Sequence, residues 1–268
     1  MDRLGYASPT SLAPAIRLEH GSASVTEETL AEETPVTFVY NGVSHAVMMA
    51  TPSDLEDFAT GFSITEGLVG DGAAISSIAV VRYAKGIELQ IDTTAEVATE
   101  ARRRRLSGRS GCGICGMADV EQVLRTLPRV ESATRFASHA VSLAMRELAD
   151  AQPLNRATGA VHAAGWASVD GAVHIVREDV GRHNALDKLI GVLVRGGIDP
   201  ATGFVVLTSR GSFELVQKVA VFGAALVAAV SAPTGLAVRM AEQAGITLAG
   251  FARADRVTVY THPARISP

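Results

Sequence analysis

The second half of the sequence alternates short apolar runs with amphipathic stretches, and this pattern constrains the fold more than any other feature. Residues 204–208 and 226–230 are continuous apolar runs of strand length. Strands that are apolar on both faces are typical of a sheet covered by helices on both sides. One of the intervening stretches places five aliphatic side chains on a single helical face: Leu186, Leu189, Ile190, Leu193 and Val194. We therefore expect a layered α/β domain in this half.

The remaining elements of that domain follow from the same periodicities and from glycine and serine boundaries. Gly196-Gly197 and Gly245 are predicted helix ends, and Ser212 is a predicted helix cap. Helices are expected at residues 140–149 and 234–243, and strands near 159–168, 173–176, 247–252 and 257–260.

The first half of the sequence predicts two hairpins around one helix. Residues 35–40 and 43–49 flank the tight-turn dipeptide Asn41-Gly42, and residues 75–83 and 87–91 flank residues 84–86. Thr51, followed by Pro52, is the predicted cap of a helix that runs to about Glu66.

These elements predict three parts along the chain. Residues 1–14 are mixed in character and are expected to be disordered. Residues 15–127 are expected to form a small α+β domain that ends in a cysteine-containing loop and a helix at 118–127. Residues 128–268 form the layered α/β domain.

Composition excludes several classes of protein. The formal charge of −4 gives no general attraction to nucleic acid or to an anionic membrane. The longest apolar stretch, residues 219–232, is shorter than the roughly 18–20 residues that a membrane span requires. The amino terminus shows no basic start followed by an apolar run. A cytoplasmic protein that binds neither nucleic acid nor membrane is expected.

Cys112 and Cys115 are the only cysteines, so the thiol chemistry of the chain is concentrated in one Cys-x-x-Cys pair. Such a pair can be half of a zinc site, a dithiol redox centre or a carrier of persulfide sulfur. A structural zinc site needs four ligands, and no histidine stands at the close spacing of a zinc finger, so no metal is expected. Flanking glycines favour a mobile loop, and the arginines at 102–105 favour a thiolate, although a solvated basic run explains them equally well.

Three polar turns in the second half are candidate binding segments. Residues 178–184 (Glu-Asp-Val-Gly-Arg-His-Asn) join a predicted strand to a helix, residues 208–212 repeat this arrangement around Arg210, and residues 251–256 carry two arginines and a carboxylate. Arginines suit phosphates, and backbone N–H groups at a helix start suit anions. Each turn could instead be a cap that only orders its loop.

Together these motifs resemble the formate dehydrogenase accessory sulfurtransferases, the FdhD family. The resemblance runs from about Glu32 to Pro263 and is most specific over Glu178–Lys188. It is carried also by the Cys112–Cys115 motif, by residues 158–164, 231–234 and 250–253, and by shorter matches at 41–42, 49–52, 61–62 and 66–67. The family implies a second domain similar to cytidine deaminase, without the zinc signature of that enzyme.

The resemblance also implies a function. Cys112 would accept persulfide sulfur from a cysteine desulfurase, and Cys115 would assist or resolve the transfer. The sulfur would pass to the molybdenum of a bis(molybdopterin guanine dinucleotide) cofactor, bound as substrate, for a formate dehydrogenase client. A homodimer is expected on the same ground. The expected cofactor-binding residues are His183, Arg210, Phe251, Ala252, Arg253, Ala254, Asp255 and Arg256.

Two other functions remain open at this point. A chaperone could deliver the molybdenum cofactor without moving sulfur, and it would work without Cys112. A dithiol reductase would instead show a reversible Cys112–Cys115 disulfide couple and turnover with small disulfides.

Overall fold

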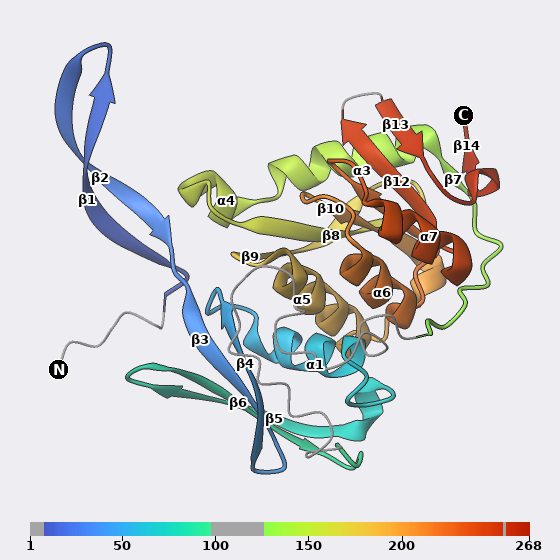
Figure 1. Ribbon diagram of the computed structural model, residues 1–268, viewed down its shortest axis with the longest axis horizontal. Helices are drawn as coiled ribbons and strands as arrows, with labels where there is room; N and C mark the ends of the chain where they lie inside the picture. Colours follow the sequence, from blue (N-terminus) through green and yellow to red (C-terminus); the bar gives the residue numbers. More distant parts are fainter. Residues whose placement is uncertain (1–7, 98–125, 254–255) are drawn as a thin grey trace.

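The computed structural model describes residues 8–97, 126–253 and 256–268. It is a mixed α/β structure built around a six-stranded sheet and a four-stranded sheet (Figure 1). Cys112 and Cys115 lie outside the described residues, and so do Ala254, Asp255 and nearly all of the helix expected at 118–127.

The six-stranded sheet has the order β13-β12-β11-β10-β8-β9. Its strands are β8 (His162–Ser168), β9 (Val173–Asp179), β10 (Gly203–Leu207), β11 (Leu226–Ala229), β12 (Thr247–Arg253) and β13 (Arg256–Val259). Strands β10, β11 and β12 are parallel, and β8 and β13 pair antiparallel to their neighbours. Since β9 is antiparallel to β8, it points the same way as β10.

Helices cover both faces of this sheet, as the apolar strands predict (Figure 1). Helices α5 (Arg182–Arg195), α6 (Phe213–Phe222) and α7 (Gly235–Ala244) share one apolar core with residues from β8, β10, β11 and β12. Helix α3 (Ser138–Asp150) packs on the opposite face with the alternate residues of the same strands. A parallel pair, β7 (Phe136–Ala137) and β14 (Ile266–Ser267), lies beside α3.

The four-stranded sheet has the order β4-β3-β6-β5 and confirms both hairpins expected in the first half. Its strands are β3 (Thr34–Tyr40), β4 (Val43–Ala50), β5 (Ile75–Tyr83) and β6 (Gly86–Thr93). Helix α1 (Leu55–Thr65) packs on it through Phe58 and Phe62, whose rings contact Phe38 on β3. This core draws its buried members from residues 36–91, and the cores of the larger sheet draw theirs from 130–252.

Helix α1 also lies against α5, and two glycines permit this contact. A Cβ atom on Gly61 would stand 1.7 Å from the backbone oxygen of Asp187, and one on Gly191 would stand 1.8 Å from that of Asp57. Both distances are far inside van der Waals contact, so only glycine fits at either position. We call this α1–α5 contact, with the buried ion pairs beside it, the seam.

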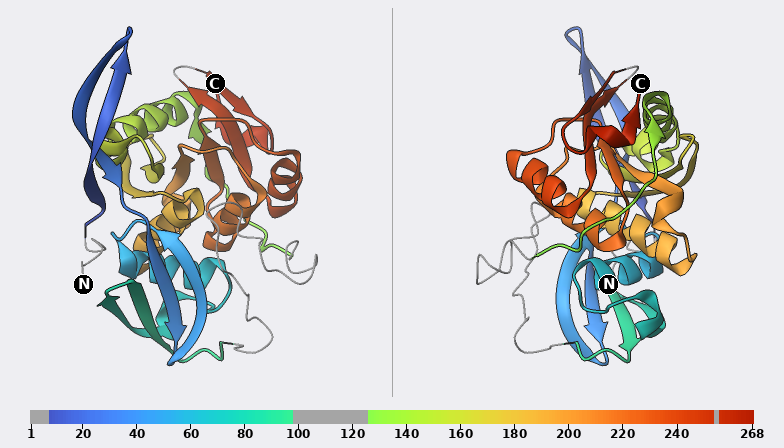
Figure 2. Two further views of the ribbon diagram at one scale, coloured as in Figure 1. Left: turned by 60° about the vertical axis from the view of Figure 1, so that its left-hand side comes forward. Right: turned by 90° about the vertical axis from the view of Figure 1, so that its right-hand side faces the viewer.

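The amino-terminal region differs from the expectation. Residues 10–14, expected to be disordered, belong to β1 (Thr10–Glu19), which pairs with β2 (Ser22–Ala31) in a two-stranded ribbon. The ribbon stands out from the body of the protein (Figures 1 and 2). Its residues lie in no apolar core of the described structure. The sequence therefore carried no burial pattern from which the ribbon could be predicted.

The predicted cap of α1 is also wrong. The helix begins at Leu55, and Asp54 rather than Thr51 occupies the cap position, in a left-handed conformation and without a side-chain cap. Thr51 instead bonds to residues 179, 180 and 188 of the larger sheet and α5. A short helix, α4 (Pro153–Thr158), and three 3-10 turns at Gly72–Ala74, Pro200–Thr202 and Pro263–Arg265 were not anticipated. No helix in the described part of the chain is long and apolar enough to cross a bilayer.

Candidate functional site

The three polar turns singled out in the sequence lie along one edge of the six-stranded sheet. Strands β9, β10, β11 and β12 all point towards this edge and end there, so the segments that follow them are neighbours. Ligands of open α/β sheets bind outside the carboxyl ends of the strands. We call this region the carboxyl edge, and it carries His183, Arg210, Phe251 and Arg256.

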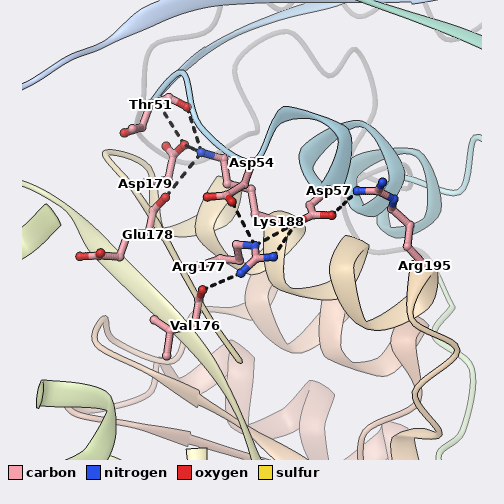
Figure 3. Close-up of polar contacts among 9 residues, drawn as sticks. All are labelled: Thr51, Asp54, Asp57, Val176, Arg177, Glu178, Asp179, Lys188 and Arg195. Carbon is pink, nitrogen blue, oxygen red and sulfur yellow. Dashed lines mark hydrogen bonds and ion pairs between the residues drawn. The ribbon is translucent and has the colours of Figure 1, made fainter. Parts of the chain in front are cut away.

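Asp179 and Lys188 of the Glu178–Lys188 segment are buried at the seam. The two side chains are fully inaccessible, and Lys188 Nζ lies 2.7 Å from Asp179 Oδ2. Lys188 also donates to the backbone oxygen of Thr51 at 2.9 Å, while the Thr51 N–H donates to Asp179 at 3.0 Å (Figure 3). Asn184 donates to Asp179 and to the backbone oxygen of Met49. These contacts join the two sheets at the first turn of α5.

Glu178 does not face a ligand either. Its carboxylate accepts hydrogen bonds from the backbone N–H groups of Leu154 and Asn155, at 3.0 and 2.7 Å, at the start of α4. The Glu178 side chain therefore stabilises the start of a short helix. This matches the alternative given above for this segment, in which a polar residue only orders its loop.

Two further ion-pair groups complete the seam. Arg177 on β9 donates two hydrogen bonds to Asp57 on α1, at 2.9 and 2.8 Å, and Arg195 approaches the other oxygen of the same carboxylate (Figure 3). On α6, Lys218 lies 2.8 Å from Asp187 and 3.1 Å from Glu66. Burial disfavours the charged lysine, but the two carboxylates outweigh it and raise the pKa of Lys218.

His183 lies in the first turn of α5, one turn before Asp187, and its side chain is not paired as the seam residues are. Its Nε2 atom lies 3.9 Å from Oε2 of Glu214, too far for a hydrogen bond, and has no hydrogen-bond partner among the described residues. Burial opposes ionisation of Glu214, but the contact with His183 lowers the pKa of this carboxyl below its ordinary value. The pair links the first turns of α5 and α6.

His162 opens β8 beside this pair. Burial, reinforced by the nearby Arg182 and His183 side chains, lowers the pKa of His162 below its ordinary value. The imidazole is consequently neutral at pH 7. His162 therefore belongs to the carboxyl edge, although the sequence pattern did not single it out as a candidate site residue.

Ser212 and Arg210 lie at the start of α6. Ser212 occupies the predicted cap position, but its side chain makes no cap hydrogen bond. Its buried Oγ has no partner with hydrogen-bond geometry in the described part of the chain, although the Ser212 side chain helps to lower the pKa of Glu214. Arg210 is exposed two residues earlier. The backbone N–H groups of a first helical turn attract anions, and an arginine beside them adds charge.

Phe251 and Arg256 form a second group on the same edge, where β12 turns into β13. The strand pairing shifts between Gly250 and Arg253, and Phe251 adopts a left-handed φ of 49°. This irregular backbone leaves the Phe251 ring 38% exposed, with the Arg256 guanidinium 5.6 Å from its centre. An exposed aromatic face with an adjacent cation can stack on a nucleobase.

The two groups lie at different places along one edge. His183 follows β9 but contacts Glu214, and the α6 start that carries Glu214 and Arg210 follows β10, two positions from β12 in the sheet and roughly 10 Å away at the usual strand spacing. His183 with Glu214, and Phe251 with Arg256, therefore suit two parts of one ligand. Ala252 is buried beneath the second group, and Arg253 belongs to β12 by its backbone.

Comparison with known proteins identifies the family of this chain. The model of the FdhD/NarQ family matches residues 31–267. The chain belongs to the FdhD/NarQ family. A sulfur carrier protein FdhD from Xanthomonas axonopodis pv. citri (strain 306) is 51% identical over 96% of this chain and 93% of its own length. The sulfur carrier protein FdhD of Bordetella petrii (strain ATCC BAA-461 / DSM 12804 / CCUG 43448) is 46% identical over 99% of both chains.

The fold is shared with a crystal structure from Desulfotalea psychrophila. That structure, described as a formate dehydrogenase accessory protein, superposes with a TM-score of 0.80 at 24% identity and covers 97% of this chain and 100% of its own. The family membership inferred from the Glu178–Lys188 segment is thus confirmed. The described residues contain no group of three or more histidines and carboxylates that could hold a metal ion.

Proposed function

We propose that this FdhD/NarQ family protein is a sulfurtransferase that carries sulfur on Cys112 and delivers it to a molybdenum cofactor for a formate dehydrogenase. The observation that carries the proposal is the identity of about half of the residues with proteins named sulfur carriers, over nearly the whole chain. The only two cysteines of the sequence, Cys112 and Cys115, supply the chemistry that this name requires.

The first step is a thiol–persulfide exchange. The Cys112 thiolate attacks the outer sulfur of a desulfurase persulfide, a new S–S bond forms on Cys112, and the desulfurase thiolate leaves. The sulfur moves without net oxidation or reduction. In the second step Cys115 attacks Cys112 Sγ, a disulfide forms, and the outer sulfur leaves as sulfide to bind molybdenum. Two equivalents of an external thiol, or one dithiol, then reduce the Cys112–Cys115 disulfide by successive exchange and leave as their own disulfide, which resets the carrier.

The carboxyl edge is the proposed binding surface for the cofactor, a bis(molybdopterin guanine dinucleotide) that is substrate rather than resident group. Phe251 and Arg256 suit a guanine base and its phosphate, and Arg210 with the first turn of α6 suits a second phosphate. Arg210 follows β10, which lies two positions from β12 in the sheet, or roughly 10 Å at the usual strand spacing. His162 and His183 lie beyond Arg210 on the same edge and can orient polar groups of the ligand.

The second domain of the family, expected to be similar to cytidine deaminase, remains part of this proposal. Strands covered by α3 on one face and by α5, α6 and α7 on the other support it. The domain division at about residue 127, the cytoplasmic location and the absence of a resident metal remain predictions.

Intact-protein mass spectrometry tests the sulfur-transfer step directly. The protein is incubated with a cysteine desulfurase and cysteine, and wild type is compared with Cys112→Ala and Cys115→Ala. We expect wild type and the Cys115 variant to gain the mass of sulfur and the Cys112 variant to gain none. If wild type gains no sulfur but still binds the cofactor, the protein is a cofactor chaperone instead. Turnover of small disulfides without sulfur gain would identify a dithiol reductase.

A further inference from the structure

A cavity of about 330 Å³ lies where helix α3 passes β13, the edge strand of the six-stranded sheet (Figure 1). Four residues of α3 line it, Ser138, His139, Ser142 and Arg146, together with Val257 of β13. Positions four apart in a helix share one face, so Ser138, Ser142 and Arg146 form a polar row along the cavity. We call this space the α3 cavity.

The α3 cavity is separate from the carboxyl edge. Neighbouring residues of a strand point to opposite faces of the sheet. Val257 packs into the apolar core on the α3 face, whereas the guanidinium of Arg256, one residue earlier, lies over the Phe251 ring. None of the described residues that line the cavity is among those proposed above to bind the cofactor.

Ser142 is the residue that points to a ligand. It is only 6% exposed, and its hydroxyl makes no hydrogen bond to any residue that the structure describes. Buried polar groups nearly always have a partner. A serine inside a helix can find one in the carbonyl oxygen four residues before it, as Ser63 does on α1 with Ala59. The Ser142 hydroxyl makes no such bond and is left for an occupant of the cavity that Ser142 lines.

The charge of the lining selects an anion. No carboxylate is among the described residues around the cavity, while Arg146 and His139 supply nitrogen donors. Ser138 and His139 lie in the first turn of α3, whose cap residue Ala137 makes no side-chain hydrogen bond, so the partial positive charge of the helix start adds to theirs. Helix side chains lean toward the amino terminus, which directs Arg146 over the turn of Ser142. Arg146 already has an interaction within the chain, and the several N–H donors of a guanidinium allow it to bind a ligand as well.

The size of the cavity fits a phosphate together with a small organic group. Its volume of about 330 Å³ is at the lower end of the roughly 300–1,000 Å³ of ligand pockets. The polar row extends about 12 Å from Ser138 to Arg146 at the usual rise of a helix. Phosphate oxygens accept hydrogen bonds from several directions, and arginine can donate two to one phosphate. We infer that the α3 cavity binds a phosphate group, free or carried by a small metabolite, with Ser138, Ser142 and Arg146 as its donors.

Titration calorimetry of the full-length protein tests this site with two probes, inorganic phosphate and glycerol 3-phosphate. We expect saturable binding, and the probe that binds more tightly distinguishes a free phosphate from one carried by a metabolite. Ser142→Ala removes one neutral hydrogen bond and should raise the dissociation constant about two- to tenfold. Arg146→Gln removes a charge-assisted bond and should raise it about ten- to a hundredfold. The exposed Arg82→Gln variant on β5 is the matched control and should bind as wild type does.

Three results would overturn the inference. The first is the absence of saturable binding of either probe below about 10 mM, and the second is wild-type affinity in both Ser142→Ala and Arg146→Gln. The third is an Arg256→Gln protein that loses as much affinity as Arg146→Gln, which would assign the phosphate to the carboxyl edge. Thermal unfolding checks that each variant retains the fold, which we expect because alanine favours a helix and Arg146 is exposed. None of these measurements depends on sulfur transfer.

Discussion

The seam and the carboxyl edge share residues 178–188 but differ in how their polar atoms are satisfied. At the seam, Asp179 has Lys188 and three N–H donors within 3.0 Å, and Asp57 has two arginines. At the edge, His183 Nε2 and Ser212 Oγ are buried and have no hydrogen-bond partner within residues 8–97, 126–253 and 256–268. Buried polar atoms are nearly always paired. A complete set of partners therefore indicates a structural role, and an incomplete set indicates a place for a ligand.

This comparison predicts the largest loss of stability for Lys188→Met. The substitution keeps most of the side-chain volume but leaves the Asp179 carboxylate buried without its counter-charge. Removing one partner of a buried ion pair costs about 3–5 kcal/mol, and we expect the lower end because three N–H donors to Asp179 remain. Urea unfolding measures the change. Lys85→Met, at an exposed turn, is the control and should change stability by less than about 0.5 kcal/mol. An equally small loss at Lys188 would mean that the seam pair is not structural.

Gly61→Ala should have the next largest effect. The added methyl group meets the Asp187 backbone oxygen, which cannot rotate away, so α1 and α5 must separate. Overpacking of this kind costs about 1–3 kcal/mol or more. Gly70→Ala is the matched control, because a Cβ atom there meets nothing within 4 Å. Comparable melting temperatures for both variants would contradict the close helix contact.

At the carboxyl edge we expect the opposite result: a substitution should leave the stability of the fold nearly unchanged and should weaken ligand binding. Arg256→Gln should change the free energy of unfolding by less than about 0.5 kcal/mol. It should weaken binding of guanosine diphosphate, a probe for one end of the cofactor, by roughly ten- to a hundredfold, since a charge-assisted hydrogen bond contributes about 1.5–3 kcal/mol. Titration calorimetry measures the affinity, and the exposed Arg82→Gln variant on β5 of the four-stranded sheet serves as control. Equal affinities of the two variants would move the nucleotide site away from β12 and β13.

The smallest expected effect concerns pH. The pKa of His162 is lowered in the folded protein, so folding favours its neutral form. Its contribution to stability is therefore present above the unfolded-state pKa of about 6.5 and is lost as the pH falls through the lower folded-state value. Wild type should lose stability between pH 7.5 and 5, and His162→Gln should lose less. The exposed His139→Gln should behave as wild type, and a His162→Gln profile identical to it would show that burial does not perturb this imidazole.

Local signals in the sequence were sufficient to predict most of the helices and strands of the fold. Asn41-Gly42 located one hairpin, and aliphatic periodicity located α5, because turn type and helical spacing are properties of neighbouring residues. Thr51 is a residue for which such local signals gave a wrong prediction. Its hydroxyl and backbone groups bind residues 128 to 137 positions away, and such partners override a local capping preference.

The candidate site was predictable in part for the same reason. The sequence located Arg210, His183 and residues 251–256 at strand ends, and the sheet order places those ends on one edge. The sequence could not show that Glu178 and Asp179 have a structural role while His183 is a candidate binding residue, since all three are polar residues of one turn. The structural role of the two carboxylates follows only from their hydrogen-bond partners in the fold, Asn155 for Glu178 and Thr51 for Asp179.

The burial of Lys188 and Lys218 has a practical consequence for labelling. The sequence contains three lysines, and these two are 0 and 5% exposed. Lys85, on the turn between β5 and β6, is left as the one exposed lysine side chain. An amine-reactive dye applied to the folded protein should therefore modify Lys85 and the terminal amine. A fluorophore on this turn sits apart from the carboxyl edge, where it can report encounters with a desulfurase or a client without engineered cysteines that would compete with Cys112.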